Sequence, residues 1–168
     1  TSRDRNQEAS PFLIHSFGVF YRDIRLYIVM EAMCSSVVDL IKNGPISEEL
    51  CRAIMFQTLH GLYFMHERQN QLHRDIKPHN LLISRNGVVK VSDFGISSKK
   101  LETIDSRQMS TFCGTITYMS PSRAAGEQYG YEGDIWSLGI TVFTLLFGKP
   151  PEITNVYHVI QYAQNPPR

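Results

Sequence analysis

The stretch His73-Arg74-Asp75-Ile76-Lys77-Pro78-His79-Asn80, followed shortly by Asp93-Phe94-Gly95, decides how this chain is interpreted. Asp75 is a carboxylate placed to receive a proton from a hydroxyl group, and the amide of Asn80, a few residues on, can hold a metal ion. Asp93 adds a second carboxylate, and oxygen ligands of this kind suit Mg²⁺. Together the two stretches predict a site for phosphoryl transfer, which depends on positioning and on neutralising phosphate charge.

Each of these residues has a simpler interpretation when it is taken alone. Asp75 and Asp93 would then be turn residues or helix caps, and Asn80 would be a loop residue. The complete set, in this order and at this spacing, favours the catalytic interpretation.

With these motifs the chain resembles the catalytic domain of eukaryotic protein kinases. The resemblance implies an α+β, protein-kinase-like fold, with ATP and Mg²⁺ as cofactors. Asp75 would orient and deprotonate the acceptor hydroxyl, and Lys77 would neutralise charge on the γ-phosphate. Asn80 and Asp93 would hold magnesium. In this family a lysine at the position of Lys77 marks Ser/Thr and dual-specificity kinases.

The resemblance also gives roles to the two residues before Asp75. It implies that His73 packs as a structural residue and is not a catalytic histidine. It implies that Arg74 pairs with a phosphate on the activation segment.

Met30-Glu31-Ala32-Met33 matches the hinge that binds the nucleotide in this family. By resemblance, the backbone of Glu31 and Met33 would hydrogen-bond adenine, and Met30 would be the gatekeeper side chain. Simple filling of the core is the structural alternative for Met30. Leu82 would lie beneath the adenine.

Hydrophobic patterns and turn signals place these motifs on elements. The runs Phe17 to Tyr21 and Leu26 to Met30 predict a β-hairpin. Val37 to Lys42 predicts a short helix, and Asn86-Gly87 predicts a two-residue hairpin turn. Ser47 fits the N-cap of a long helix. The apolar stripe of that helix, which we expect in the core, consists of Leu50, Ile54, Met55, Leu59, Leu62 and Met65.

The uncharged run from Ile135 to Gly148 is too short to cross a membrane, which takes about 20 apolar residues. It predicts a helix buried in a large helical lobe. By resemblance, Asp134 anchors the backbone of the catalytic loop.

Composition narrows the function classes. The 168 residues are 42% apolar, which suffices for one sizeable core, and 17 basic against 16 acidic residues give a net charge of +1. Because no basic stripe interleaves with aromatic residues, we expect no nucleic-acid partner. Cys34, Cys51 and Cys113 lack metal-ligand spacing and indicate reduced thiols of a cytoplasmic protein. No membrane association is expected.

By resemblance the chain covers part of a kinase domain. We expect residues 1–33 to be the end of the small N-terminal lobe with the hinge, and residues 34–168 to be the C-terminal lobe through about the family's helix G. A Gly-rich loop and a strand lysine, which hold the phosphates in this family, do not precede the hinge in this sequence. We therefore expect this chain on its own to transfer phosphate negligibly.

The run from Thr111 to Pro121 resembles the MAP kinase kinases, whose substrates are MAP kinases and which an upstream kinase activates. By this resemblance Thr111 is the main regulatory site, with Ser106 second and Ser110 as the alternative. All three could instead be ordinary polar loop residues. Thr115 would line the site that receives the substrate hydroxyl.

Ser122 departs from the family pattern, which has glutamate at this position. That glutamate forms a buried ion pair in the family, so its absence predicts a less firmly anchored activation segment. Two other functions remain open. One is a non-catalytic, kinase-like binding module, and the other is a Ser/Thr kinase of another group.

Overall fold

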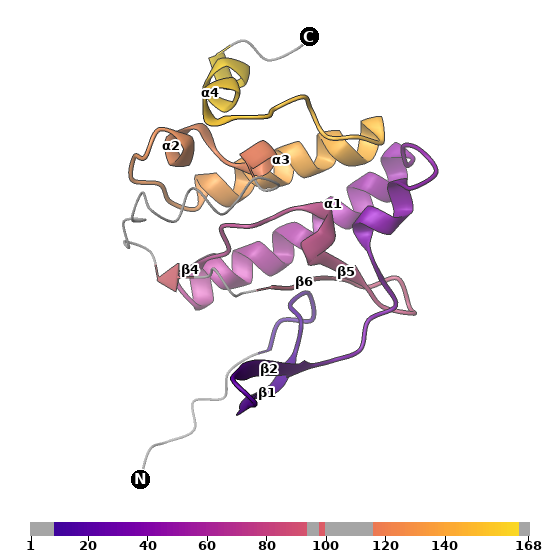
Figure 1. Cartoon of the computed structure of the whole chain (residues 1–168). Coiled ribbons are helices and arrows are strands. Elements are labelled where there is room, and N and C mark those ends of the chain that lie inside the picture. The colour runs from indigo at the N-terminus through magenta and orange to yellow at the C-terminus, as the bar shows by residue number, and fades with distance from the viewer. Residues whose placement is uncertain (1–8, 94–97, 100–115, 165–168) are drawn as a thin grey trace.

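The computed structural model describes residues 9–93, 98–99 and 116–164, in which two long helices lie against each other (Figure 1). Helix α1 (Glu48–Tyr63) begins after Ser47, whose Oγ accepts a hydrogen bond of 3.3 Å from the N–H of Leu50. This confirms the predicted N-cap. Helix α3 (Glu132–Phe147) ends at Gly148, whose φ of 73° suits a glycine C-cap. Among the described ranges, no helix is both long and apolar enough to cross a membrane.

The main core lies between these helices and the short strands beside them. Its buried members include Val37, Ile54, Leu62, Met65, Ile76, Leu81, Val91, Leu138 and Leu145. The predicted stripe on α1 is wrong at two positions, because Leu50 and Leu59 are 42% and 38% exposed. The buried face of α1 is centred on Ile54 and Thr58, so Leu50 and Leu59 lie at or beyond its margins.

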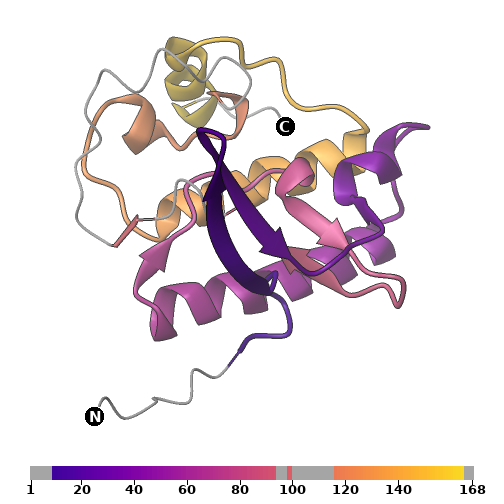
Figure 2. The same ribbon diagram turned by 60° about the horizontal axis from the view of Figure 1, so that its bottom comes forward.

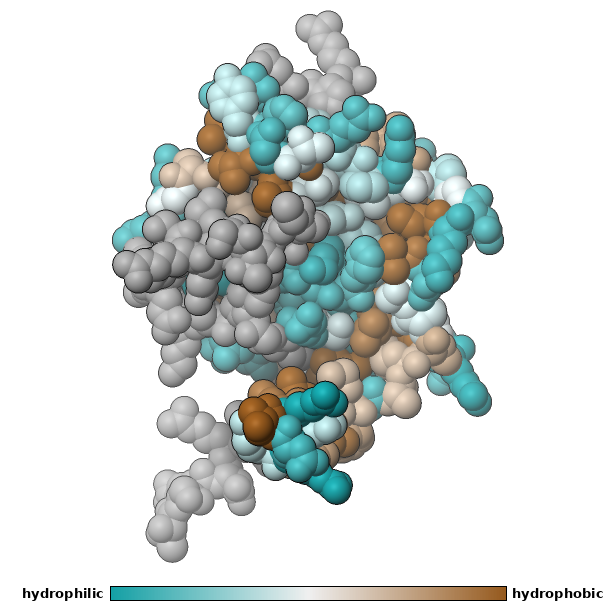
Figure 3. Space-filling view, in the orientation of Figure 1, coloured by the Kyte–Doolittle hydropathy of each residue, from teal (hydrophilic) through white to brown (hydrophobic). Residues whose placement is uncertain are grey.

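The predicted hairpin is present as β1 (Ser16–Arg22) and β2 (Arg25–Met30), which pair antiparallel. Asp23 and Ile24 form its turn with φ values of 49° and 62°, and two positive φ values are what a type I′ turn requires. The side chains of both strands are exposed (Figure 3). In Figure 2 the hairpin comes forward, on one side of the helical part.

A three-stranded sheet connects the hairpin to the helices. Its order is β3 (Ser35–Ser36), β5 (Leu81–Ile83), β6 (Val89–Val91). The turn between β5 and β6 differs from the two-residue turn predicted from Asn86-Gly87. Ser84 and Val88 close a three-residue loop, and Gly87 takes a φ of 74°. A type I turn followed by one left-handed residue also fits the twist of the flanking strands, so Gly87 alone supplies the positive φ.

Short elements complete the described part. The predicted helix after the hinge is a 3₁₀ helix, η1 (Val37–Ile41), and α1 continues into a single π-helical turn, η2 (Phe64–Arg68). Strand β4 (Gln71–Leu72) pairs with β7 (Ser98–Lys99). The remaining elements are η3 (Pro78–Asn80), η6 (Ile116–Tyr118), α2 (Pro121–Ala124) and α4 (Val156–Gln164).

Candidate active site

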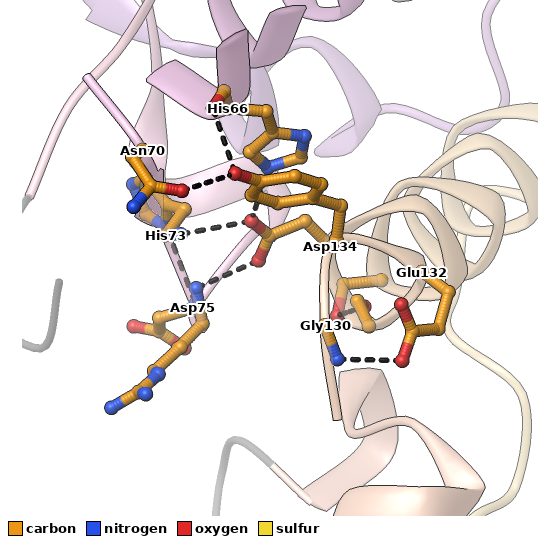
Figure 4. Close-up of polar contacts among 11 residues, drawn as sticks. His66, Asn70, His73, Asp75, Gly130, Glu132 and Asp134 are labelled. Carbon is orange, nitrogen blue, oxygen red and sulfur yellow. Dashed lines mark hydrogen bonds and ion pairs between the residues drawn. The ribbon is translucent and has the colours of Figure 1, made fainter. Parts of the chain in front are cut away.

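Asp134, buried in the first turn of α3, fixes the backbone between β4 and η3 (Figure 4). Its Oδ2 accepts a 2.8 Å hydrogen bond from the N–H of His73, and its Oδ1 accepts one of 2.7 Å from the N–H of Arg74. The Nε2 of His66 donates to the same carboxylate over 2.8 Å. Burial raises the pKa of Asp134, but the hydrogen bonds from His66, His73 and Arg74 outweigh it, so the pKa lies below its ordinary value. A charged carboxylate therefore holds this loop.

The His73 imidazole is fully buried and links the loop to the end of β6. Its Nε2 donates to the carbonyl oxygen of Ser92 over 2.8 Å, and its Nδ1 accepts a 3.2 Å hydrogen bond from the N–H of Asp75. One donor and one acceptor define a neutral ring with its proton on Nε2. Burial also lowers the pKa of His73. This position suits the structural role that the sequence resemblance implies.

Asp75, Lys77 and Asn80 come together on the loop. The Oδ2 of Asp75 accepts hydrogen bonds of 2.7 Å from Lys77 Nζ and 2.9 Å from Asn80 Nδ2. Asn80 Nδ2 also donates to the backbone carbonyl of Asp75 over 2.8 Å. The other carboxylate oxygen, Oδ1, is buried and has no hydrogen-bond partner within the described part of the chain. A buried acceptor without a donor is costly, so Oδ1 is suited to receive a hydroxyl from a substrate.

Ser92 brings Asp93 beside the loop that carries Asn80. The N–H and the hydroxyl of Ser92 donate to the carbonyl oxygen of Asn80 over 2.9 and 3.1 Å. Asp93 follows with an exposed side chain and a φ of 66°. Among the hydrogen bonds that the structure describes, none uses the amide oxygen Oδ1 of Asn80.

One carboxylate and one amide oxygen form a donor set that fits Mg²⁺, which keeps several water or phosphate ligands. Because they offer this donor set, Asn80 and Asp93 could hold a magnesium ion that is shared with a phosphate. Within the described ranges, no group of three or more His, Cys, Asp or Glu side chains forms a metal cluster.

The hinge segment is held by the side chain of Glu31. Its carboxylate accepts hydrogen bonds of 2.7 Å from the N–H of His15 and 2.6 Å from Lys90 Nζ. Burial raises the pKa of Glu31, but the hydrogen bonds from Lys90 and His15 outweigh it and lower the pKa. The backbone carbonyl of Glu31 and the backbone groups of Met33 make no hydrogen bond among the described residues. The adenine contacts of Glu31 and Met33 stay a prediction from the sequence, and these backbone groups are available for them.

Met30 and Leu82 flank the same region. Met30 ends β2 and is 42% exposed, so it does not fill a core in this structure. Leu82 is half-buried on β5, directly opposite Lys90 on β6. Because Lys90 contacts Glu31, the hinge and the strand that carries Leu82 are adjacent.

Arg74 adopts a left-handed backbone with a φ of 71°, and its carbonyl oxygen accepts a hydrogen bond from the guanidinium of Arg123. The two guanidinium carbons lie 5.4 and 5.9 Å from the centre of the Tyr129 ring. A small pocket beside them is lined by Arg74, Arg123, Tyr129 and Ser120, among others. The loop thus contacts the segment that follows the activation segment.

The predicted regulatory and substrate residues Ser106, Ser110, Thr111 and Thr115 lie outside the described residues. Ser122 is half-buried, and its hydroxyl oxygen lies 3.3 Å from that of Ser120.

The sequence interpretation did not identify His66, Ser92 or Tyr131 as parts of the site. His66 follows the buried Met65 at the end of α1, and a histidine next to core positions was the one signal available. Ser92 precedes Asp93 but matches no chemical pattern of its own.

The protein kinase domain model matches residues 5–164, and the chain therefore belongs to the protein kinase domain family. It is 43% identical over 144 residues to mitogen-activated protein kinase kinase 5 of Leishmania mexicana. This alignment covers 85% of this chain and 27% of that protein. It is 38% identical over 168 residues to mitogen-activated protein kinase kinase 1 of Arabidopsis thaliana, covering 94% and 47%.

A third relative is dual specificity mitogen-activated protein kinase kinase 1 of Dictyostelium discoideum, 37% identical over 150 residues, with 88% of this chain and 22% of that protein covered. These similarities confirm the predicted resemblance to the MAP kinase kinases. The chain spans less than half the length of these curated relatives.

Proposed function

We propose that the protein containing this chain transfers the γ-phosphate of ATP to a Ser or Thr hydroxyl, and also to Tyr, of a protein substrate. The Asp75 carboxylate carries this proposal. Lys77 and Asn80 fix one of its oxygens, while the other is buried and has no partner among the described residues. This arrangement leaves one oriented acceptor for the proton of an incoming hydroxyl.

The neighbouring side chains have distinct roles in this proposal. Asp75 Oδ1 orients the acceptor hydroxyl and takes its proton, while Lys77 lowers the local negative charge. Asn80 and Asp93 would hold magnesium, which neutralises charge on the phosphate oxygens when it is bound. The hinge backbone at Glu31 and Met33 would bind adenine, with Met30 as the gatekeeper side chain and Leu82 beneath the adenine. Residues 1–33 then belong to the smaller lobe with the hinge, and residues 34–168 to the larger lobe.

The similarity to MAP kinase kinases supports a narrower proposal. The substrate is a MAP kinase, an upstream kinase activates the protein, and Thr115 lines the acceptor site. The free thiols of Cys34 and Cys51 suit a cytoplasmic location.

Paired substitutions in the full-length protein test the catalytic assignment. Asp75→Asn removes the proton acceptor, so the rate of phosphoryl transfer should fall about 10²- to 10⁴-fold while the Kd for nucleotide stays nearly unchanged. Asp93→Asn removes a magnesium ligand, so it should also weaken magnesium-dependent nucleotide binding. Transfer of labelled phosphate to a MAP kinase and calorimetric titration of nucleotide with Mg²⁺ measure the two effects. Glu48→Gln, at an exposed position on α1, is the matched control.

The transfer assay, together with a calorimetric titration of the MAP kinase, separates the catalytic proposal from a binding module. A wild-type protein that binds a MAP kinase but transfers no phosphate would support the binding module. Equal losses of nucleotide affinity in both variants would contradict the separate roles of Asp75 and Asp93.

We also propose that a phosphate on Thr111 pairs with Arg74 and orders the activation segment. Thr111→Ala in the full-length protein should block activation by the upstream kinase while nucleotide affinity stays unchanged. Ser106→Ala should reduce activation partly. If Thr111→Ala activates normally and Ser110→Ala does not, Ser110 is the regulatory site and this assignment is wrong.

A further inference from the structure

Tyr131, the residue before α3, packs against His66 in a contact that the family motifs did not indicate. The two rings are stacked, with their centres 4.2 Å apart and their planes 17° apart. The Tyr131 hydroxyl lies 2.8 Å from both the carbonyl oxygen of His66 and the Oδ1 of Asn70, and it donates its proton to these two acceptors. The Tyr131 side chain therefore contacts both the imidazole ring of His66 and the backbone of the η2 turn.

The η2 turn departs from regular α-helical geometry, and side-chain contacts therefore help to set its conformation. It is a single π-helical turn, and at its C-terminal end the N–H of Gln69 donates to the carbonyl of Phe64 over 3.3 Å. Asn70 then takes a left-handed φ of 51°, which is uncommon for a residue other than glycine. The chain continues through β4 directly to His73. A change in the backbone conformation of the η2 turn would therefore shift the start of the catalytic loop.

The His66 imidazole connects this turn to the loop anchor. One face of the ring lies against Tyr131, and its Nε2 donates to the Oδ2 of Asp134. The same Asp134 oxygen accepts from the N–H of His73, while Oδ1 accepts from Arg74. His66 and Asp134 are 7% and 2% exposed, so this network is shielded from water and depends on ring orientation.

We propose that Tyr131 is a positioning residue for the catalytic loop. Its ring sets the plane of the His66 imidazole, and its hydroxyl fixes the η2 turn. Both keep the Asp134 carboxylate aligned with the amides of His73 and Arg74. Asp75 directly follows these two residues, so Tyr131 acts on the reacting group through His66 and Asp134. Its effect on catalysis rests on the proposed kinase function, but its effect on the loop does not.

Hydrogen exchange of the His73 and Arg74 amides tests the effect on the loop in this 168-residue chain. Tyr131→Phe keeps the ring and removes the hydroxyl, so exchange at these amides should become roughly 2- to 10-fold faster. Tyr131→Leu also removes the stacked ring, and the acceleration should reach roughly 10- to 100-fold. Core amides of α1, such as those of Ile54 and Leu62, should be unaffected in Tyr131→Phe. Tyr157→Phe, on an exposed tyrosine of α4, is the matched control.

Asn70→Gly checks the hydroxyl contact, because glycine accepts the left-handed φ but lacks the Oδ1 atom. If the hydroxyl acts partly through Asn70, Tyr131→Phe should accelerate exchange less in the Asn70→Gly background than in the wild type. Unchanged exchange at His73 and Arg74 in both Tyr131 variants would overturn the proposal. Equal acceleration throughout α1 would also overturn it, because Tyr131 would then contribute only to general stability.

The catalytic readout uses the full-length protein. Tyr131→Phe should lower kcat several-fold and leave the KM for ATP unchanged, because the contacts of Tyr131 with His66 and Asn70 act on the start of the catalytic loop and involve no hinge residue. An equal change in both constants would contradict positioning of Asp75. If the wild-type protein transfers no phosphate, the proposed function fails, and hydrogen exchange still decides the role of Tyr131.

Discussion

At the scale of single residues, Asp134 shows how the fold can hold a buried charge. A buried carboxylate is strongly unfavourable unless it is well hydrogen-bonded. Here the side chain of His66 and two consecutive backbone N–H groups, those of His73 and Arg74, satisfy it. The result is a rigid start for the catalytic loop, because consecutive amides that bind the two oxygens of one carboxylate fix the local backbone.

Asp134→Asn should lower the free energy of unfolding of this chain by about 2–5 kcal/mol, because an amide nitrogen would replace one acceptor facing buried donors. Urea denaturation measures this change. Glu48→Gln, at an exposed position, should change it little.

The pH dependence gives a second check on Asp134. Because its pKa is lowered in the folded state, the carboxylate stabilises the fold above the ordinary aspartate pKa of about 3.9. That stability is lost as the pH falls through the folded pKa. The Asn variant should therefore lose less stability between pH 5 and acid than the wild type. Parallel acid-denaturation curves would contradict the assignment.

At the scale of elements, Gly61 allows α1 to approach the segment before β1. A Cβ atom at this position would lie 2.9 Å from the carbonyl oxygen of Phe12, 3.2 Å from Val91 and 3.3 Å from Leu13. Helix propensity favours alanine over glycine by about 1 kcal/mol, but the neighbouring atom is backbone and cannot move aside easily. Close packing therefore outweighs propensity at this residue.

Gly61→Ala should lower the free energy of unfolding by about 1–3 kcal/mol. Gly139 in α3 is the matched control, since a Cβ there would meet nothing within 4 Å. Gly139→Ala should raise the stability by about 0.5–1 kcal/mol. Chemical denaturation of the two variants checks both signs. Stabilisation by Gly61→Ala would show that the segment before β1 does not pack as described.

At the scale of the whole described part, the hairpin is much less supported than the helices. Its exposed side chains include Phe17 (66%), Tyr21 (69%), Ile24 (89%) and Leu26 (64%). The residues that flank it are linked to β6 by the ion pair of Glu31 with Lys90 and by a 2.9 Å hydrogen bond from the N–H of Ile14 to the carbonyl of Val91. A two-stranded hairpin with little buried apolar surface is marginally stable on its own.

Native-state hydrogen exchange of this chain should therefore separate two regions. Amides of β1 and β2 should exchange through local opening, at least about 100-fold faster than core amides of α1 and α3. Lys90→Met, which removes the ion pair with Glu31, should widen the difference. Equal protection in the hairpin and the helices would contradict this division.

How much the sequence predicted depends on how local the determining signal is. The hairpin, the N-cap at Ser47 and the helix around Asp134 follow from short-range patterns, and the structure confirms them. The predicted burial of that helix holds for one face only, because Ile135 and Phe147 are 48% and 62% exposed. The loop before Val88 has three residues and not the two that the sequence predicted, because both turn types can contain Asn-Gly. Leu50 and Leu59 differed because periodicity finds a helical stripe but not which edge of it other elements cover.

For the candidate site, the sequence by itself determined the chemical groups, because the spacing of Asp75, Lys77, Asn80 and Asp93 is a property of the chain. The tertiary structure alone decided which of their atoms are fixed and which remain available. The ion pair of Lys90 with Glu31 and the packing of Tyr131 on His66 join residues from different elements, and burial within the described part of the chain leaves Asp75 Oδ1 without a hydrogen-bond partner. Such contacts depend on how helices and strands pack, and no local sequence pattern predicts that packing.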